Sequence, residues 1–139
     1  MEKTKLIELL NQALQGEYTD VFSYPREAGI IEEKAISEKF EKFGRMELRH
    51  ADNVAMQIQI LGGKPNWEFA LIDTKESIEE ILRGHLERET KAVQMYDSLI
   101  KLADEEGEDQ CVDAALWVQH QVRPQHAGDG PACPDGRRL

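Results

Sequence analysis

The chain has 139 residues, enough for one compact domain with its own core and too few for two ordinary domains. Its formal net charge is −10, from 27 acidic and 17 basic side chains, so we expect no nonspecific binding to nucleic acid or to anionic membranes. No apolar run approaches the roughly 20 residues of a transmembrane helix, and the first residues do not resemble a secretion signal. The two cysteines form no metal-binding pair. We therefore expect a cytoplasmic protein.

The first predicted helix begins near Lys3 or Thr4 and has one apolar stripe along its length. Glu17 interrupts this stripe, so a carboxylate is expected on the buried side. Pro25 is expected to kink or loosen the helix, because proline removes a backbone hydrogen bond and crowds the preceding turn. Residues 27–33 are expected to form the connection to the next helix. The apolar positions of the stripe are Leu6, Leu10, Ala13, Leu14, Val21 and Tyr24.

The second predicted helix runs from about residue 32 to Leu61, and the glycines at 62–63 with Pro65 beyond them indicate its end. Glu47 and His50 occupy two consecutive positions of its apolar stripe. Burying an unpaired carboxylate is very costly, so this pair requires either hydrogen bonds with a buried cation or a metal ion. The remaining stripe positions are Ile36, Phe40, Phe43, Val54, Ile58 and Leu61.

Residues 64–75 are too many for a tight turn and show no helical stripe, so we expect a crossover to the other end of the domain. Trp67, Phe69 and Leu71 are expected to pin this crossover onto the bundle. A third helix is predicted to begin near residues 73–76 and to end near Ala103. Glu89 lies on its stripe, whereas Glu87 is about 200° away around the helix and is expected to face solvent. The other stripe positions are Ile78, Leu82, His85, Ala92, Tyr96 and Leu99, flanked by Val93.

The C-terminal part of the sequence predicts a short fourth helix over residues 111–122, stopped by Pro124. A loosely held tail, rich in glycine and proline, is expected after it. We therefore expect a helical domain over residues 1–123 and a tail over residues 124–139, with His120 and His126 solvated.

Three predicted helices each place side chains that bind metals on their buried faces. These are Glu17 on the first helix, Glu47 with His50 on the second, and Glu89 on the third. Carboxylates and imidazole together suit iron, manganese or zinc better than metals that prefer sulfur ligands. His85, one turn before Glu89, is either a further ligand, a partner of the ligands, or a packed core histidine.

An alternative interpretation of the buried acids needs no metal. A buried salt-bridge network with Arg45, Arg49 or Lys91 would also neutralise them. None of these basic residues lies on the apolar stripes, which favours the metal interpretation.

Four segments resemble the ferritin-like superfamily, and most closely bacterioferritin: Leu14-Gln15-Gly16-Glu17, Glu47-Leu48-Arg49-His50-Ala51-Asp52, Ile60-Leu61-Gly62-Gly63-Lys64-Pro65-Asn66 and Ile81-Leu82-Arg83-Gly84-His85-Leu86-Glu87-Arg88-Glu89. The resemblance implies an all-α four-helix bundle with a long crossover between the second and third helices and a buried diiron centre. It also implies that Glu17, Glu47, His50 and Glu89 are the metal ligands, and that Tyr24 is a tyrosine able to donate an electron to the centre.

Two positions depart from the pattern of that family. Leu48 stands where bacterioferritin has its haem-ligating methionine, so we expect no haem of that kind. The fourth helix would carry a second Glu-x-x-His motif, whose positions fall near Val122 and Gln125 in this chain. The fourth helix is therefore expected to be short or degraded. With four ligands, one metal is expected to bind tightly and a second weakly.

The function implied by the resemblance is the binding of ferrous iron and its oxidation by oxygen or peroxide. In a homo-oligomer this ferroxidase chemistry would serve iron storage or detoxification. One alternative is a non-catalytic helical assembly module with an incomplete metal site. Another is a rubrerythrin-like peroxidase, which is disfavoured because the sequence has no Cys-x-x-Cys segment.

Overall fold

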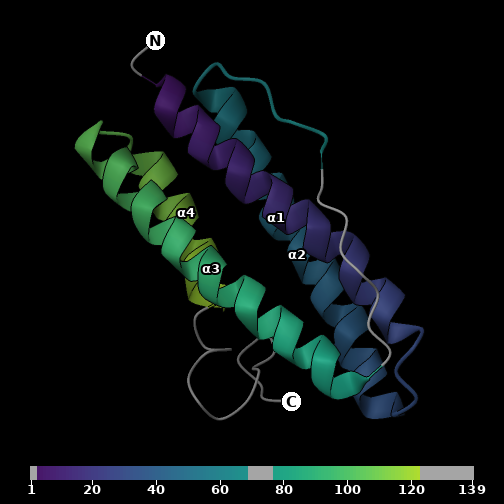
Figure 1. Cartoon of the computed structure of the whole chain (residues 1–139). Coiled ribbons are helices and arrows are strands. Elements are labelled where there is room, and N and C mark those ends of the chain that lie inside the picture. Colours follow the sequence, from purple (N-terminus) through teal and green to yellow (C-terminus); the bar gives the residue numbers. More distant parts are fainter. Residues whose placement is uncertain (1–2, 69–76, 123–139) are drawn as a thin grey trace.

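The computed structural model describes residues 3–68 and 77–122. Within this part of the chain all regular structure is helical: α1 (Thr4–Ala28), α2 (Lys34–Ile60), α3 (Ile78–Glu105) and α4 (Asp109–Val122). Figure 1 shows two antiparallel pairs, α1 with α2 and α3 with α4, packed side by side. Because α2 and α3 run in the same direction, residues 61–77 must lead from one end of the bundle to the other. The predicted all-α bundle with a long crossover and a short fourth helix is confirmed.

Helix α1 extends further than the sequence predicted. Pro25 lies inside it, and the helix continues to Ala28 before the connection begins at Gly29. Gly44 of α2 faces this point, where an added Cβ would lie 3.1 Å from Pro25 Cδ. The absence of a side chain at Gly44 therefore allows α1 and α2 to approach closely beside the proline.

Helices α2 and α3 each end at a glycine with a positive φ angle. After α2, Gly62 has φ +84° and its amide bonds to the carbonyl of Gln59, while the amide of Gly63 bonds to the carbonyl of Ile58. This paired arrangement requires a left-handed residue, which glycine adopts without steric cost. Gly107, with φ +73°, ends α3 in the same way.

The start of α3 lies later than predicted. Its first residue is Ile78, and Ser77 is the N-cap, with Ser77 Oγ accepting a hydrogen bond from the amide of Glu80 at 3.3 Å. A serine hydroxyl that accepts from the third amide is a favourable start for a helix. Residues 73–76, where the sequence predicted the start, lie outside the described part of the chain.

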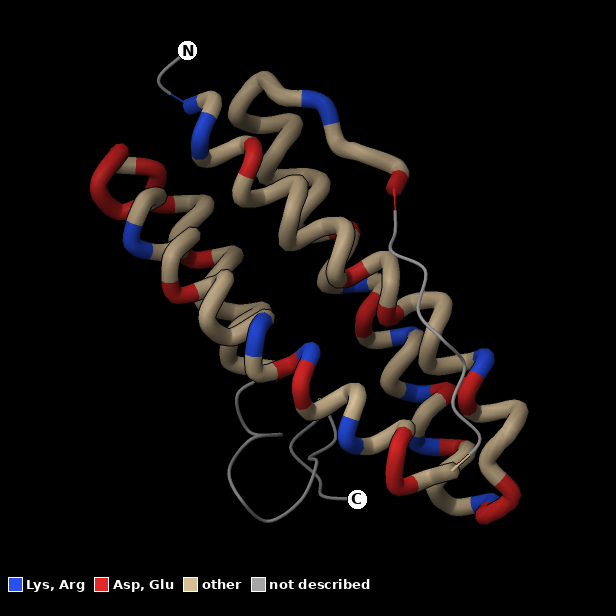
Figure 2. Tube along the Cα trace, in the orientation of Figure 1, with Lys and Arg blue, Asp and Glu red and all other residues tan. Residues whose placement is uncertain are grey.

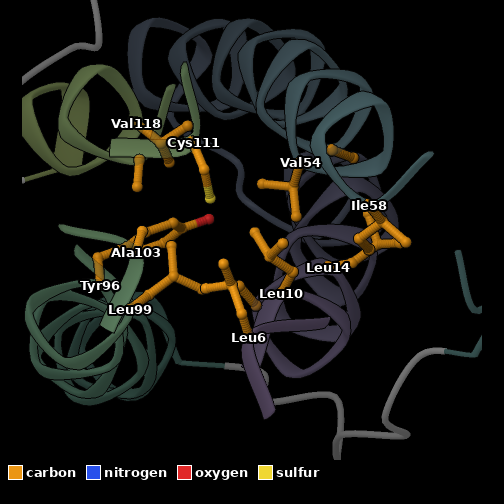
Figure 3. Packing of buried hydrophobic residues seen from close by; sticks show 13 residues of the cluster. Leu6, Leu10, Leu14, Val54, Ile58, Tyr96, Leu99, Ala103, Cys111 and Val118 are labelled. Carbon is orange, nitrogen blue, oxygen red and sulfur yellow. The ribbon is translucent and has the colours of Figure 1, made fainter. Parts of the chain in front are cut away.

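The core has two parts. All four helices contribute to the first (Figure 3), whereas the second contains side chains from α1, α2, α3 and the α1–α2 connection only. The reason is length, since α4 has 14 residues and α3 has 28, so α4 covers only the C-terminal half of α3. Leu82 and Val93, which the sequence placed in the core, are half-buried. The second part comprises Tyr24, Ala28, Ile31, Phe40, Phe43 and Ile81.

The segment after α2 is held mainly by one polar side chain. Asn11 Nδ2 donates to the carbonyl of Lys64 at 3.2 Å, and Asn11 Oδ1 accepts from the amide of Asn66 at 2.8 Å. Trp67 stacks on Tyr18 with ring centroids 6.0 Å apart, but its side chain stays 81% exposed. Trp67 therefore contributes less to this attachment than the sequence predicted. The structure does not describe the other two residues expected to pin the segment, Phe69 and Leu71.

Residues of both charge signs are distributed along the helices, and acidic residues are concentrated at the turn between α3 and α4 (Figure 2). Lys3 forms an ion pair with Glu108 of this turn and so ties the start of α1 to it. No helix in the described ranges is long and apolar enough to cross a membrane.

Candidate metal centre

Three potential metal ligands meet between α1 and α2. His50 Nδ1 lies 3.2 Å from Glu17 Oε1 and 3.2 Å from Glu47 Oε2. One donor atom from each residue can be chosen so that all three lie within 4.8 Å of one another. Each residue is buried. The structure thus brings together three of the four side chains that the sequence proposed as ligands.

This convergence follows from helix periodicity. Glu47 and His50 are three residues apart, which places them on one face of α2. Glu17 lies on the apolar stripe of α1, and α1 and α2 pack antiparallel along their lengths. The two inward-facing stripes meet between the helices. Glu17 of α1 therefore lies at the same level of the bundle as Glu47 and His50 of α2.

The other two helices close the cluster with aromatic side chains. Tyr96 of α3 donates a hydrogen bond from its hydroxyl to Glu17 Oε2 at 2.9 Å, and Figure 3 shows this hydroxyl pointing into the space between the helices. Trp117 of α4 lies edge-to-face with His50, at a centroid distance of 5.4 Å and an interplanar angle of 86°. Tyr96 therefore holds one carboxylate oxygen of Glu17 in place, and Trp117 packs against the imidazole of His50.

Without metal, the cluster shares protons among its three members. Burial raises the pKa of Glu47 well above its usual range, and the nearby charge of Glu17 adds to the rise. Burial alone would raise the pKa of Glu17, but hydrogen bonds with Glu47 and His50 outweigh it and lower that pKa. Burial opposes the charged form of His50, yet the two carboxyl groups raise its pKa to about 10. These shifts favour a proton on Glu47 and on His50 and an ionised Glu17 when no metal is bound.

Glu89 lies apart from the three-residue cluster. It is buried, and Tyr24 donates a hydrogen bond from its hydroxyl to Glu89 Oε1 at 3.0 Å. Burial, together with the charge of Asp20, raises the pKa of Glu89 to about 8. The structure thus joins Glu89 to Tyr24, the two sequence candidates outside the cluster.

A second polar group, of which the sequence reasoning identified only His85, lies beside Tyr24. His85 Nε2 forms a hydrogen bond with Glu27, and the His85 ring stacks on Tyr24 with centroids 4.1 Å apart. Arg88 bonds to both His85 and Asp20. Because α1 continues past Pro25, Glu27 lies three residues after Tyr24 on the same stripe. This spacing is the sequence signal that could have identified Glu27.

A solvent-open groove leads to the cluster between α1 and α3. Its volume is about 240 Å³, and both Glu17 and Tyr96 line it. Asp20 and Arg88 form part of the same wall, together with the exposed Lys91. An ion or a small molecule in the groove would therefore contact Glu17.

The donor set fits a divalent metal better than a salt-bridge network. Arg45, Arg49 and Lys91, the basic residues that such a network would need, are all exposed. Within the described residues, the ion pairs of Glu17 and Glu47 lead only to His50. Two buried carboxylates with one imidazole are a ligand combination that suits iron, manganese or zinc.

A four-helix bundle with a long crossover, whose helices direct carboxylates and imidazole inward, defines a class of metal-binding helical proteins. The sequence matches the ferritin-like domain family over residues 7–125, and the chain belongs to this family.

Relatives and solved structures are consistent with this membership. The chain is 26% identical over 110 residues to a bacterioferritin from Desulfovibrio desulfuricans, covering 76% of this chain and 62% of that relative's length. A ferritin-like diiron-carboxylate protein from Bacillus anthracis superposes with a TM-score of 0.84 at 23% identity, covering 88% of this chain and 91% of the other.

Two bacterioferritin structures share the fold. The D. desulfuricans protein, described with its diiron site in different catalytic states, has a TM-score of 0.82 at 21% identity and covers 88% of this chain and 74% of its own. The Rhodobacter capsulatus protein, described with a metal-free dinuclear site and haem iron, has a TM-score of 0.79 at 24% identity, covering 86% and 77%. The resemblance to bacterioferritin expected from the sequence is confirmed.

Proposed function

We propose that the protein binds ferrous iron at Glu17, Glu47 and His50 and promotes its oxidation to ferric iron by oxygen or peroxide. The observation that carries this proposal is the meeting of two buried carboxyl groups and one imidazole at His50 Nδ1. The ferritin-like family to which the chain belongs supports iron over manganese or zinc as the substrate metal.

The cluster favours oxidation because of its charge. Carboxylate ligands stabilise a ferric ion more strongly than a ferrous ion, so binding here makes the loss of an electron easier. Each bound ferrous ion gives up one electron, so two successive binding and oxidation events, with two protons, reduce one oxygen molecule to hydrogen peroxide. Metal binding itself displaces protons, because the ligands must be deprotonated, and Glu47 and His50 hold such protons in the metal-free chain.

Glu89 and Tyr24 have separate parts in this proposal. Glu89 is the nearby carboxylate that would complete the ligand shell after a change of side-chain position, since Tyr24 holds it in the metal-free form. Tyr24 would serve as an electron donor, because its phenol is buried and donates a hydrogen bond to Glu89, which can accept the phenolic proton when Glu89 is ionised. Leu48 offers no ligand atom, and the proposal includes no haem.

At the scale of the cell, we propose that this chemistry serves iron storage or detoxification in a cytoplasmic homo-oligomer. Iron and oxidant would reach Glu17 through the groove between α1 and α3.

The test combines metal analysis with oxygen uptake. Protein purified without chelators is expected to contain iron, and added ferrous iron is expected to cause oxygen consumption. Glu47→Gln should abolish both, because it removes a ligand charge while keeping the side chain's size. Glu87→Gln is the matched control, since Glu87 is exposed on α3. Bound metal without oxygen consumption would instead support the non-catalytic assembly module, and consumption of peroxide alone would support the peroxidase.

A further inference from the structure

The contribution of α4 to the centre differs from that of the other helices. This helix has 14 residues and ends at Val122, while Trp117, in its second half, is the residue that contacts His50. The described part of the chain therefore presents an indole ring to the cluster from the side where the fourth helix of a diiron bundle supplies a carboxylate and an imidazole.

The polar side chains near Trp117 on α4 are directed elsewhere. Gln119 is buried, but its amide donates to the carbonyl of Val93 at 3.2 Å and to Asp97 Oδ1 at 2.6 Å. His120 is exposed. Among the described residues, α4 thus adds neither a carboxylate nor an imidazole to Glu17, Glu47 and His50.

The balance of charge indicates how many metal ions this cluster can hold. Glu17 and Glu47 supply two negative charges when both are ionised, which one divalent cation neutralises. A second divalent cation would leave an excess of positive charge in a buried site, even with Glu89 included, and uncompensated buried charge is very costly. A complete diiron bundle avoids this cost, because four glutamates balance two divalent ions.

We propose that each chain holds a single tightly bound divalent metal at Glu17, Glu47 and His50, and that the Trp117 indole closes the side where a second metal and its ligands would lie. This inference rests on the proposed function only in assuming that the cluster binds metal. It differs from the diiron centre that the family resemblance implies, and the physical reason is the replacement of fourth-helix ligands by an apolar ring next to His50.

The position of Trp117 provides a direct readout. The chain has two tryptophans, and the other, Trp67, is 81% exposed at the start of the crossover. Cobalt(II) quenches tryptophan emission at short range. The variant Trp67→Phe has Trp117 as its one tryptophan. We expect cobalt(II), added to the metal-free full-length variant, to reduce its emission until one ion is bound per chain. The matched variant Trp117→Phe, which retains Trp67, should lose less emission, because Trp117 contacts His50 whereas Trp67 stacks on Tyr18.

Calorimetric titration of both variants with cobalt(II) gives the stoichiometry independently, and one tight site per chain is expected in each. Two equally tight sites would overturn the single-metal inference while leaving the proposed function intact. One tight site that survives His50→Ala, or that leaves Trp117 emission unchanged, would overturn the assignment to this cluster. No binding in any variant would overturn the proposed function as well.

Discussion

Tyr96 of α3 donates a hydrogen bond to a carboxyl group of the three-residue cluster. Its hydroxyl bonds to Glu17 Oε2, and both groups are buried. Buried carboxylates depend on such bonds, because water cannot replace them.

Tyr96→Phe is therefore expected to reduce the free energy of unfolding by about 1.5–3 kcal/mol, the range for hydrogen bonds to charged groups. It should also raise the pKa of Glu17 by removing one of the bonds that lower it. Denaturant unfolding measures the first effect, with Tyr18→Phe, a half-buried tyrosine of α1, as the control. Equal stability of Tyr96→Phe and the parent chain would show that the bond makes no net contribution.

The thiol of Cys111 illustrates how burial controls reactivity at a single residue. Burial, together with the charges of Glu108 and Glu106, raises its pKa from about 9 to about 11. The thiolate is the reactive form, so two pKa units reduce its fraction about a hundredfold. Because the folded state favours the neutral thiol, the stability from this group is present below pH 9 and is lost as the pH rises toward 11.

In Cys133→Ser, where Cys111 is the remaining cysteine, a thiol-specific disulfide reagent at pH 8 is expected to react about a hundredfold or more slowly with the folded than with the denatured chain. The ratio should fall as the pH rises through 9. Equal rates in both states would mean that Cys111 is accessible in the fold.

At the scale of the elements, the groove between α1 and α3 is the route to Glu17 that the structure offers. Gly16 lines this groove, and an added Cβ there would meet no atom within 4 Å. A large side chain at this position can therefore fill the groove without displacing the packing of either helix.

Gly16→Phe is expected to slow metal association several-fold while changing the equilibrium affinity little, because it obstructs the path and spares the ligands. Stopped-flow mixing with cobalt(II) measures the rate, and Gln59→Phe, on an exposed position of α2, controls for the added ring. Unchanged association in Gly16→Phe would direct attention to another entry path.

Helix periodicity accounts for most of what the sequence predicted correctly. The three- and four-residue spacing placed Glu17, Glu47 and His50 on inward faces, and the structure brings them within one ligand sphere. Spacing determines which face a residue occupies but not its hydrogen-bond partner. The hydrogen bond between Tyr24 and Glu89 is therefore a feature that the spacing alone does not specify.

The local errors have identifiable causes. Pro25 was expected to kink or loosen α1, with the connection beginning at Glu27. In the last turn of α1 the missing amide costs only one bond, so Glu27 stays helical and reaches His85. Several residues before α3 could serve as caps, and propensity alone did not distinguish them from Ser77. The contact between Trp117 and His50 depends on how far α4 extends along the bundle, which no pattern within α4 specifies.

At the scale of the whole molecule, the candidate metal centre connects all four helices. Glu17, Glu47 and His50 link α1 to α2, while Tyr96 and Trp117 connect them to α3 and α4. A metal ion held by these residues would therefore stabilise the packing of all four helices, since the ligands come together only in the folded chain.

Metal binding should accordingly raise the melting temperature of the whole bundle. A metal that binds only the folded state adds about 2.7 kcal/mol when its free concentration is a hundred times the dissociation constant, or roughly 10 °C for a domain of this size. His50→Ala removes the imidazole and should abolish most of this shift, whereas His120→Ala, on an exposed position of α4, should retain it. The comparison uses the shift within each variant, with and without manganese(II), because His50→Ala also removes the imidazolium that neutralises Glu17 in the metal-free chain. If metal leaves the melting curve of the parent chain unchanged, the cluster is held together by hydrogen bonds alone and binds no metal. Equal shifts in the parent chain and both variants would mean that the metal binds outside the cluster.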